Sequence, residues 1–322
     1  MEKKCDQSLS GSKALLKEEI KRLKEEKGAV ILAHYYVDGE IQDLADYVGD
    51  SLALAQKAAA WCGDARVIVM CGVNFMGETV KILCPDKKVL VPDMAAGCSL
   101  ADSCPADEFA QFIAANPGYT VVSYVNTSIG VKALTDILVT SGNAKKIIES
   151  LPEDEKIIFG PDKNLGNYIN SVTGRKMLLW DGACHVHERF SLPKVLELKK
   201  QYPSARVLVH PECKRPLTLV ADCVGSTAAL LDYAIKSDAD TFIVATESGI
   251  LHEMMKNCPD KTFIPAPPDD ATTCGCNECN FMKLNTLEKL RDCLRDELPE
   301  ITVDPELAHK AMRPIDRMLE LS

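Results

Sequence analysis

The apolar segments of the chain recur in a fixed order at a spacing of about 85 to 91 residues. The segment VILAHYY, which ends near His34, returns as VVSYVN at Tyr124 and as VLVHPE at His210, at steps of 90 and 86 residues. A shorter apolar segment follows each of these, around Val48, Val139 and Val224. Self-similarity at a fixed period indicates copies of one structural unit, so we predict three copies.

Two more apolar segments complete each copy, and helical patterns separate the segments. The third segments read RVIVMCG, KIIFGPD and TFIVATE, and the fourth begin at Lys88, Lys176 and Lys261. Amphipathic helical patterns cover roughly 41–48, 51–61, 75–84, 142–150, 163–173, 192–201, 226–236 and 247–257. Strands that alternate with helices are typical of a parallel sheet covered on both faces. The predicted fold class is therefore α/β, with each copy an αβα sandwich.

Helical patterns also occupy both ends of the chain. Residues 13–27 carry an amphipathic pattern, and two more patterns separated by LPEITVDPE fill the chain from Leu284 to Ser322. We therefore divide the chain into an N-terminal helix (1–27), three repeats (28–98, 99–184 and 185–279) and C-terminal helices that pack back on the repeats (280–322).

Composition narrows the class of protein. The 322 residues are 46% hydrophobic, but no apolar run approaches twenty residues, so no membrane span is expected. The polar N-terminal segment lacks an apolar stretch of signal-peptide length, which favours a cytoplasmic protein. A net charge of −10 disfavours nucleic acid and anionic membranes as partners, although a local pocket can still accept an acidic substrate.

Fourteen cysteines in a chain expected to stay in the cytosol do not indicate a disulfide framework. Cys98, Cys184 and the run Cys274, Cys276 and Cys279 each follow the last strand of a copy, and the ends of such strands are where α/β sheets bind ligands. One cysteine from each copy would hold a 4Fe-4S cluster and leave one iron open as a Lewis acid. Small buried side chains are instead expected for Cys62, Cys71, Cys213, Cys223 and Cys293.

The CxCxxC run by itself fits zinc as well as an iron-sulfur cluster. His185 or His187 could supply the fourth ligand that a structural zinc site needs. The threefold placement of cysteines favours the open iron site. Two other classes stay open at this point: a zinc-containing sugar-phosphate lyase or aldolase, and an iron-sulfur electron carrier or sensor.

Hydroxyl side chains stand where helical patterns begin in all three copies. Ser51, Ser141 and the pair Ser226 and Thr227 each follow a short strand and precede a helical pattern. Hydroxyls and free N–H groups at a helix start bind phosphate or carboxylate. Ordinary helix capping explains any one of them better, but the threefold recurrence supports anion binding as strongly as capping.

Polar residues follow the first strand of each copy. His34 precedes Tyr36, Tyr124 precedes Asn126, and His210 precedes Glu212 by two positions. Together these residues offer a general base or acid, phenol donors and an amide, which can move protons and orient a carbonyl substrate. Each alone could be a structural residue that makes a hydrogen bond at a strand end.

Ten motifs in order carry a resemblance to a known family. They are AHYY (33–36), GDSLALA (49–55), CGVNFMGETVKILCPDK (71–87), GCSLADSCP (97–105), YVNTS (124–128), VTSGNA (139–144), FGPDKNLG (159–166), CHVHERF (184–190), HPEC (210–213) and GST (225–227). The chain resembles the quinolinate synthase family from about residue 30 to 322. The resemblance implies three homologous domains around a pseudo-threefold axis. It also implies a transferase that condenses iminoaspartate with dihydroxyacetone phosphate to quinolinate, phosphate and water in de novo NAD biosynthesis.

The resemblance further implies a role for each matching residue. The ligands of a 4Fe-4S cluster would be Cys98, Cys184 and Cys279. Tyr36, assisted by His34, would transfer protons, and Glu212 would act as a general base beside His210. The substrate-binding residues would be His34, Ser51, Tyr124, Asn126, Ser141, His187, His210, Glu212 and Thr227.

The last cysteine run departs from the family pattern, which is a lone cysteine or CxxCxxC. A thiol-disulfide control proposed for the CxxC form therefore transfers poorly to Cys274 and Cys276, and neighbours separated by one residue make a strained disulfide. The implied protein partner is an enzyme that forms iminoaspartate, L-aspartate oxidase or aspartate dehydrogenase, in a transient contact.

Overall fold

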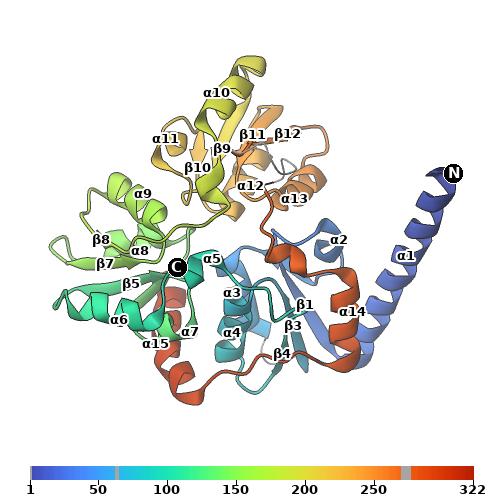
Figure 1. Cartoon of the computed structure of the whole chain (residues 1–322), viewed down its shortest axis with the longest axis horizontal. Coiled ribbons are helices and arrows are strands. Elements are labelled where there is room, and N and C mark those ends of the chain that lie inside the picture. The colour runs from blue at the N-terminus through green and yellow to red at the C-terminus, as the bar shows by residue number, and fades with distance from the viewer. Residues whose placement is uncertain (1, 62–64, 270–276) are drawn as a thin grey trace.

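The computed structural model describes residues 2–61, 65–269 and 277–322. These residues form three four-stranded parallel sheets, which lie around a common centre (Figure 1). The strand orders are β2-β1-β3-β4, β6-β5-β7-β8 and β10-β9-β11-β12, so the three sheets share one topology. The predicted α/β fold of three αβα units is confirmed.

The strands follow the predicted apolar segments. The first sheet contains β1 (Ala29–His34), β2 (Tyr47–Gly49), β3 (Val67–Cys71) and β4 (Lys88–Leu90). The second contains β5 (Thr120–Tyr124), β6 (Ile137–Val139), β7 (Ile157–Gly160) and β8 (Leu178–Leu179). The third contains β9 (Arg206–Val209), β10 (Cys223–Val224), β11 (Thr241–Ala245) and β12 (Thr262–Pro265).

Each unit also has three helices between its strands. They are α2 (Gly39–Gln42), α3 (Ser51–Trp61) and α4 (Asn74–Leu83); α7 (Ile129–Lys132), α8 (Ala144–Ser150) and α9 (Lys163–Thr173); and α11 (Arg215–Thr218), α12 (Thr227–Lys236) and α13 (Ile250–Asn257). The remaining helices are α1 (Glu2–Lys27), α5 (Ser99–Asp102), α6 (Ala106–Ala114), η1 (His187–Arg189), α10 (Leu192–Gln201), η2 (Met282–Leu284), α14 (Leu287–Asp296) and α15 (Pro305–Leu321).

An aspartate fixes the first strand of every unit. Asp46, Asp136 and Asp222 each accept a hydrogen bond from the backbone N–H of the residue fifteen positions upstream, at 2.8, 2.9 and 2.8 Å. The N–H of each aspartate in turn donates to the carbonyl of that same upstream residue. This double contact sets the start of the short second strand, and it recurs at the same steps of 90 and 86 residues as the apolar segments.

The helix predicted over 41–48 is wrong in its second half. The helix α2 ends at Gln42, and Tyr47–Gly49 forms the edge strand β2. Tyr47, Val48 and Gly49 pair in parallel with Leu32, Ala33 and His34 of β1. Pairing with a long buried strand outweighs the local helical pattern of a segment this short.

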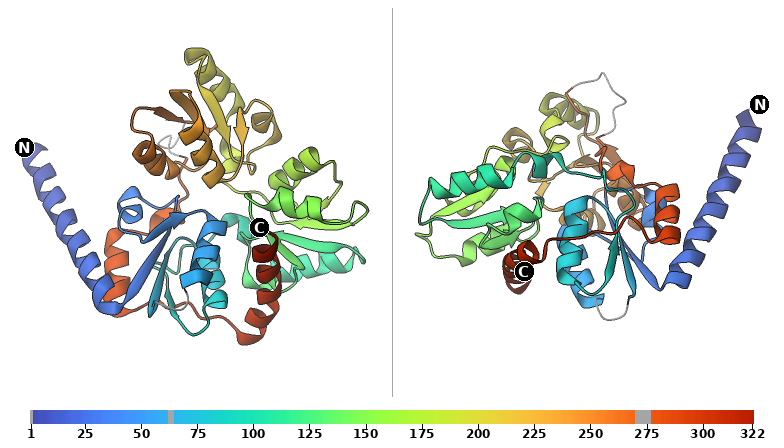
Figure 2. Two further views of the ribbon diagram at one scale, coloured as in Figure 1. Left: turned by 180° about the vertical axis from the view of Figure 1, so that it is seen from behind. Right: turned by 60° about the horizontal axis from the view of Figure 1, so that its bottom comes forward.

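The last helices return the chain to the first two units. The helix α14 packs against α1, and its buried Leu287, Leu290 and Leu294 join the core of the first sheet. The helix α15 packs against α4 of the first unit and against β6 and α7 of the second. The views from behind and from below show α15 beside these elements, whereas the N-terminal part of α1 projects from the body (Figure 2).

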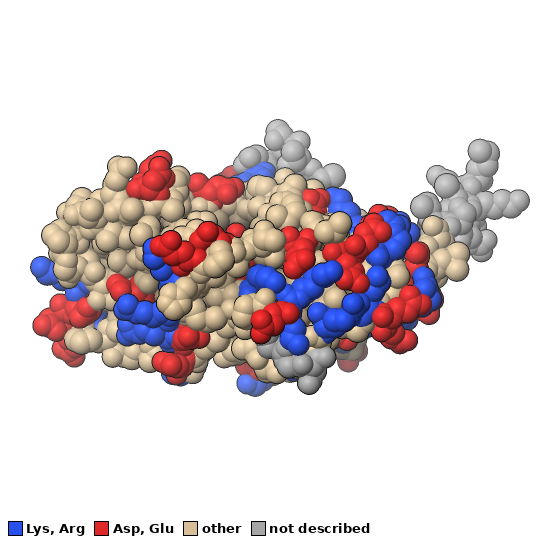
Figure 3. Space-filling model, turned by 90° about the horizontal axis from the view of Figure 1, so that it is seen from below, with Lys and Arg blue, Asp and Glu red and all other residues tan. Residues whose placement is uncertain are grey.

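The surface seen from below carries charges of both signs. Lysine, arginine, aspartate and glutamate side chains are interspersed on this face rather than gathered by sign (Figure 3). Among the described residues, no helix combines the length and apolar character needed to span a bilayer.

Candidate active site

A pocket opens where the carboxyl ends of the strands of the three sheets face one another. In each sheet the first strand lies between the second and the third, so the connections on its two sides run in opposite directions. Open α/β sheets bind ligands at such switch points. All the predicted site residues line this one pocket: His34, Tyr36, Ser51, Cys98, Tyr124, Asn126, Ser141, Cys184, His187, His210, Glu212, Thr227 and Cys279.

Tyr36 reaches the pocket from the loop after β1. Its hydroxyl lies 2.8 Å from the hydroxyl of Thr227 and 2.8 Å from that of Thr246, both in the third unit. Burial raises the pKa of Tyr36 well above 10, although the two threonine hydroxyls act in the opposite direction. The phenol is therefore protonated at neutral pH and can donate a proton or a hydrogen bond.

His34, the last residue of β1, supports Tyr36. Its ring lies edge-on to the ring of Tyr36 at 4.4 Å, and its Nδ1 accepts a hydrogen bond from the Tyr36 N–H at 3.2 Å. Burial lowers the pKa of His34 to about 3, even though the charge of Glu212 raises it. A neutral ring that accepts at Nδ1 carries its proton on Nε2, so His34 offers a donor to the pocket.

Glu212 is a buried carboxylate that contacts three aromatic residues. Its Oε1 accepts a hydrogen bond from the Tyr124 hydroxyl at 2.7 Å, and its Oε2 lies 3.2 Å from His187 Nδ1. His210 Nδ1 is 3.7 Å from Oε1, and the rings of His187 and His210 stack at 4.6 Å. Burial raises the pKa of Glu212, but the histidines and Tyr124 outweigh burial and lower it. Glu212 is thus held as the anion, the form a general base requires.

His210 links Glu212 to a hydroxyl of the second unit. Its Nε2 lies 3.3 Å from Ser141 Oγ, and its Nδ1 accepts from the Glu212 N–H at 3.4 Å. Burial lowers the pKa of His210 to about 3, with Glu212 opposing this shift and His187 adding to it. His210 repeats the arrangement of His34, in which Nδ1 accepts a backbone N–H two residues on.

Ser51, Ser141 and Thr227 occupy one position in the three units, five residues after the aspartate that fixes each first strand. Asp50 precedes α3 and accepts from the Ala53 N–H at 3.0 Å, and Ser226 caps α12 by accepting from the Ala229 N–H. The residues that cap α3 and α12 are therefore Asp50 and Ser226, one position before Ser51 and Thr227. The hydroxyls of Ser51 and Thr227 line the pocket instead.

The third hydroxyl differs from the prediction in one respect. The helix α8 begins at Ala144 after a turn, so Ser141 does not stand at a helix start. The N–H of Thr140 donates to Asn143 Oδ1, and this bond holds the turn that leaves Ser141 beside His210.

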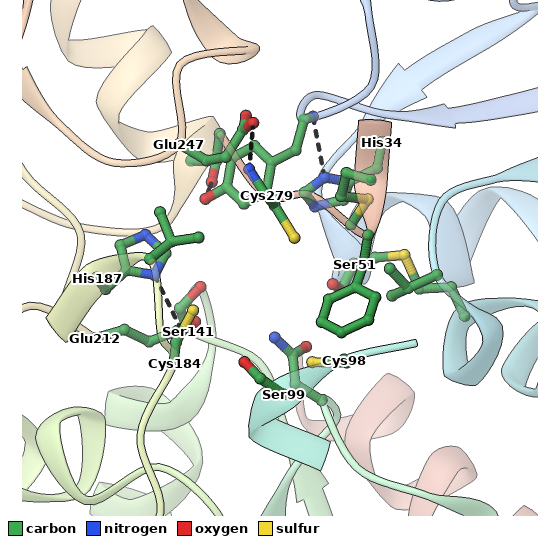
Figure 4. A pocket seen from close by; sticks show the side chains of 18 of the residues that line it. His34, Ser51, Cys98, Ser99, Ser141, Cys184, His187, Glu212, Glu247 and Cys279 are labelled. Carbon is green, nitrogen blue, oxygen red and sulfur yellow. Dashed lines mark hydrogen bonds and ion pairs between the residues drawn. The ribbon is translucent and has the colours of Figure 1, made fainter. Parts of the chain in front are cut away.

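Three cysteines, one after the last strand of each unit, point their sulfur atoms into the same space (Figure 4). Cys98, Cys184 and Cys279 each precede a helical turn, because each carbonyl accepts from the N–H four residues on. Two N–H groups of that turn act on each thiol and lower its pKa: those of Leu100 and Ala101 on Cys98, those of Val186 and His187 on Cys184, and those of Phe281 and Met282 on Cys279. The three thiols are thus built alike.

The environment of these thiols suits metal ligands. Burial raises the pKa of Cys98 to about 12 and raises that of Cys184 and Cys279, while the N–H donors of the turns act in the opposite direction. Metal binding offsets the cost of burying a thiolate, and the nearby N–H groups stabilise the negative charge of the sulfur. Asn126 Oδ1 is also buried and makes no hydrogen bond, as expected for a group that meets a ligand.

This donor set fits the group predicted from the sequence. Among the described residues three thiols line the pocket, one fewer than a closed Cys₄ site has, which agrees with a cluster that keeps one open iron. Cys274 and Cys276 lie outside the described residues. Cys184, His187 and Glu212 also have ligand atoms within 4.8 Å of one another, and such a mixed set fits zinc.

The cysteines predicted to be small buried side chains mostly are. Cys71, Cys213 and Cys293 are buried, Cys223 is partly buried, and Cys62 lies outside the described residues. None of these four described thiols lines the pocket.

The pocket also contains residues for which the sequence predicted no role there. They include Asp50, Phe75, Met76, Ser99, Thr140, Glu247, Phe281 and Met282. Ser99 Oγ lies 2.6 Å from Nδ1 of His185, which also lines the pocket. The helix-start rule pointed to Ser51 and missed its neighbour Asp50. No sequence signal separated Phe75 or Phe281 from ordinary core residues.

Comparison with known proteins gives one consistent result. The family model described as quinolinate synthetase A protein matches residues 18–320. A quinolinate synthase of Thermosynechococcus vestitus is 58% identical over 303 residues, which cover 94% of each chain. The quinolinate synthases of a Synechococcus strain and of Chloroherpeton thalassium are 56% and 55% identical, over 94% and 95% of this chain and 94% of theirs.

Proposed function

The chain belongs to the quinolinate synthase family, and we propose that it condenses iminoaspartate with dihydroxyacetone phosphate to quinolinate, phosphate and water in de novo NAD biosynthesis. The product keeps the oxidation level of the two substrates, so this transferase needs no external oxidant. The observation that carries the proposal is the meeting of three thiols, one per unit, with ionised Glu212 and protonated Tyr36 in one pocket.

Cys98, Cys184 and Cys279 would hold a 4Fe-4S cluster. When bound, such a cluster supplies an iron without a protein ligand, a Lewis acid that can take substrate oxygen atoms. Two N–H groups of its own helical turn favour the thiolate form of each cysteine, which is the form that binds iron.

Three hydroxyls would hold the anionic groups of the substrates. Ser51 and Thr227 stand at the starts of α3 and α12, where free N–H groups add to the hydroxyl, and Ser141 is held by His210. Iminoaspartate brings two carboxylates and dihydroxyacetone phosphate brings a phosphate. Tyr124, Asn126 and His187 would orient the carbon skeleton between these anchors.

Two groups would move the protons. Tyr36, oriented by Thr227 and Thr246 and assisted by neutral His34, would donate to the leaving phosphate and serve the enolisation of the three-carbon substrate. Glu212 would take the proton from carbon or nitrogen, and His210 beside it would orient the substrate. The two groups come from different units, so a substrate between them meets an acid on one side and a base on the other.

A zinc-containing lyase or aldolase is the second candidate. It is favoured by the approach of Cys184, His187 and Glu212 to within 4.8 Å of one another. It would use the same anion sites but hold a single metal with three protein ligands and an open position. Such an enzyme would cleave or isomerise a sugar phosphate and would form no pyridine ring.

The protein is expected to act in the cytoplasm on small molecules, with no nucleic acid and no membrane as partner. Iminoaspartate is unstable in water, so a transient contact with L-aspartate oxidase or aspartate dehydrogenase would shorten its path.

Product analysis under anaerobic conditions tests the proposal. The iron-loaded protein is supplied with dihydroxyacetone phosphate and with iminoaspartate formed in place from aspartate, and quinolinate is measured by chromatography. We expect quinolinate and phosphate in equal amounts, and none when either substrate is left out. Cleavage of a sugar phosphate without quinolinate would favour the zinc enzyme.

A further inference from the structure

Two buried carboxyl groups stand at the same place in the second and third units and have no role in the chemistry described above. Asp162 follows the last residue of β7, Gly160, by two positions, and Glu247 follows the last residue of β11, Ala245, by two. The side chains of both are fully buried. A buried carboxyl is expensive unless its oxygens are paired, so its partners indicate what it does.

Asp162 joins a helix start to a cysteine of the pocket. Its Oδ1 accepts a hydrogen bond from the Leu165 N–H at 2.7 Å, which caps α9. Its Oδ2 accepts from the N–H of Cys184 at 3.3 Å. One side chain therefore fixes the backbone of Cys184 to the end of β7 and to the first turn of α9.

Glu247 makes the equivalent pair of contacts in the third unit. Its Oε2 accepts from the Gly249 N–H at 2.7 Å, just before α13. Its Oε1 accepts from the N–H of Cys279 at 3.1 Å, and Lys283 Nζ lies 3.7 Å from the same oxygen. In Figure 4 a dashed line joins the Glu247 carboxylate to the Cys279 backbone nitrogen, and the sulfur points away from the carboxylate.

The first unit anchors its cysteine loop through other contacts. Its equivalent position is Val73, which has no carboxyl, and the next residue, Asn74, takes over. The Asn74 N–H donates to the carbonyl of Ala96 at 2.8 Å, and its side-chain amide donates to the carbonyl of Met94. The loop that leads to Cys98 is thus anchored before the cysteine rather than at it.

We propose that Asp162 and Glu247 are positioning residues that fix the backbone of Cys184 and Cys279 so that both sulfurs face the cluster. This inference rests on the proposed function, because it assumes that these thiols bind iron. Each carboxyl accepts from the N–H of its cysteine, and the N–H groups two and three residues further on favour the thiolate form of that cysteine. Groups that orient ligands in this way typically matter about 10- to 100-fold for metal retention or activity.

Isosteric amides separate this role from packing. In Asp162→Asn and Glu247→Gln one oxygen becomes an NH₂ group, which cannot accept from the cysteine N–H. Asparagine still caps a helix well, so α9 should keep its start. The control is Glu78→Gln, which changes a largely buried carboxyl on α4 that lies near Lys132 and the Ile129 backbone.

The experiment measures release of iron from the loaded protein to a chelator under anaerobic conditions. We expect release to be about 10-fold or more faster in Asp162→Asn and in Glu247→Gln than in the wild type, and unchanged in Glu78→Gln. In iron-free protein, iodoacetamide should label Cys184 faster only in Asp162→Asn, and Cys279 faster only in Glu247→Gln. A general loss of structure would change both cysteines together.

The outcomes keep the two claims apart. A wild-type protein that binds no iron would contradict the proposed function, whereas an iron-loaded wild type with both variants at the control rate would overturn this inference alone. If Asp162→Asn does not fold, Asp162→Ser provides the same test, since serine caps α9 with its single oxygen and leaves the Cys184 N–H without an acceptor. Iron retention by folded Asp162→Ser at the wild-type rate would also overturn the inference.

Discussion

Tyr36 belongs to the first unit, but the two hydroxyls that hold it belong to the third. Thr227 starts α12 and Thr246 follows β11, and both lie 2.8 Å from the phenol oxygen. The hydroxyl therefore has a defined direction only when the two units are in contact. A proton donor with its orientation fixed in advance loses little entropy when the substrate arrives.

Replacement of Tyr36 by phenylalanine removes the proposed proton donor and leaves the ring. We expect Tyr36→Phe to keep the wild-type iron content and to lower kcat about 100-fold or more, the usual worth of general acid catalysis. The matched control is Tyr35→Phe, because Tyr35 is the neighbouring tyrosine and does not line the pocket. Equal kcat values for Tyr36→Phe and the wild type would remove Tyr36 from the mechanism.

The proposed cysteine ligands predict a sharp division among the thiols. Cys98→Ala, Cys184→Ala and Cys279→Ala should each abolish both the cluster and turnover, because each unit would contribute one ligand. Cys258→Ala, which changes a buried thiol outside the pocket, should keep both. Iron and sulfide analysis of the four purified proteins checks this. Loss of the cluster in Cys276→Ala but not in Cys279→Ala would show that the third ligand is wrong.

Residues at strand ends could be predicted from the repeats, but their partners could not. His34, Tyr124 and His210 are visible in the sequence because they share a repeat position, and the structure brings all three to one pocket. Asp162 and Glu247 also share a repeat position, in FGPD and VATE, so a signal was present. This signal could not predict the role of the two carboxyl groups, because their contacts with Cys184 and Cys279 depend on the path of loops about 20 to 30 residues later.

The order of strands and helices agrees closely with the order predicted from the sequence. The predictions are wrong mainly at short elements. The segment 41–48 has the apolar spacing of a helix, yet Tyr47–Gly49 is an edge strand that pairs with β1. In the same way α8 begins at Ala144 rather than beside Ser141. Both differences arise within a few residues of a turn, where one side-chain hydrogen bond decides the backbone and apolar periodicity carries no information.

The C-terminal end of α14 is tied to the first unit by one side chain. Glu297, with a left-handed backbone (φ 51°), contacts Lys27 at 3.1 Å, Arg66 at 3.1 Å and Lys88 at 2.7 Å. These residues come from the end of α1, the segment before β3 and the start of β4. Hydrogen bonds from Lys88 and Lys27 lower the pKa of Glu297 to about 2.

This network predicts a stability difference that depends on pH. A carboxyl whose pKa falls on folding stabilises the fold above its unfolded value of 4.5 and loses that effect as pH falls toward 2. Glu297→Gln should therefore lower the free energy of unfolding by about 1 kcal/mol at pH 7 and low salt, and the difference should vanish as pH falls from about 4.5 to 2. Denaturant unfolding at several pH values measures it.

The control for this experiment is Glu306→Gln. Glu306 is exposed and pairs with Lys310 one helical turn away, so its change should cost no more than about 0.5 kcal/mol. A constant difference between Glu297→Gln and the wild type from pH 7 to pH 2 would contradict the charge network and indicate a packing effect.

At the scale of the whole molecule, the chain closes a ring of three units. It leaves the third sheet after Cys279, covers the first sheet with α14 and then spans the first two units with α15. This closure brings the last cysteine back to the pocket formed with the first two. The threefold architecture was predictable because repetition is a property of the sequence itself; the course of α15 depends on which apolar faces remain uncovered.

Substitutions in α15 can test whether this helix joins the first and second units. Ile315 is fully buried and packs in a cluster with Ala55 and Ile82 of the first unit and Leu138 of the second. Ile315→Ala should lower the free energy of unfolding by about 2–5 kcal/mol through the cavity it leaves. Ile235→Ala, at a position 47% exposed, should stay within about 0.5 kcal/mol of the wild type. Equal effects of the two changes would mean that α15 does not join the units.

We propose that one thiol from each unit holds a cluster with an iron left for the substrate. The direct test is iron and sulfide analysis of anaerobically purified protein, with Mössbauer spectra recorded with and without quinolinate. We expect about four irons per chain, with the spectrum of one of them changed by quinolinate. Zinc in place of iron, or four irons whose spectra are the same with and without quinolinate, would contradict it.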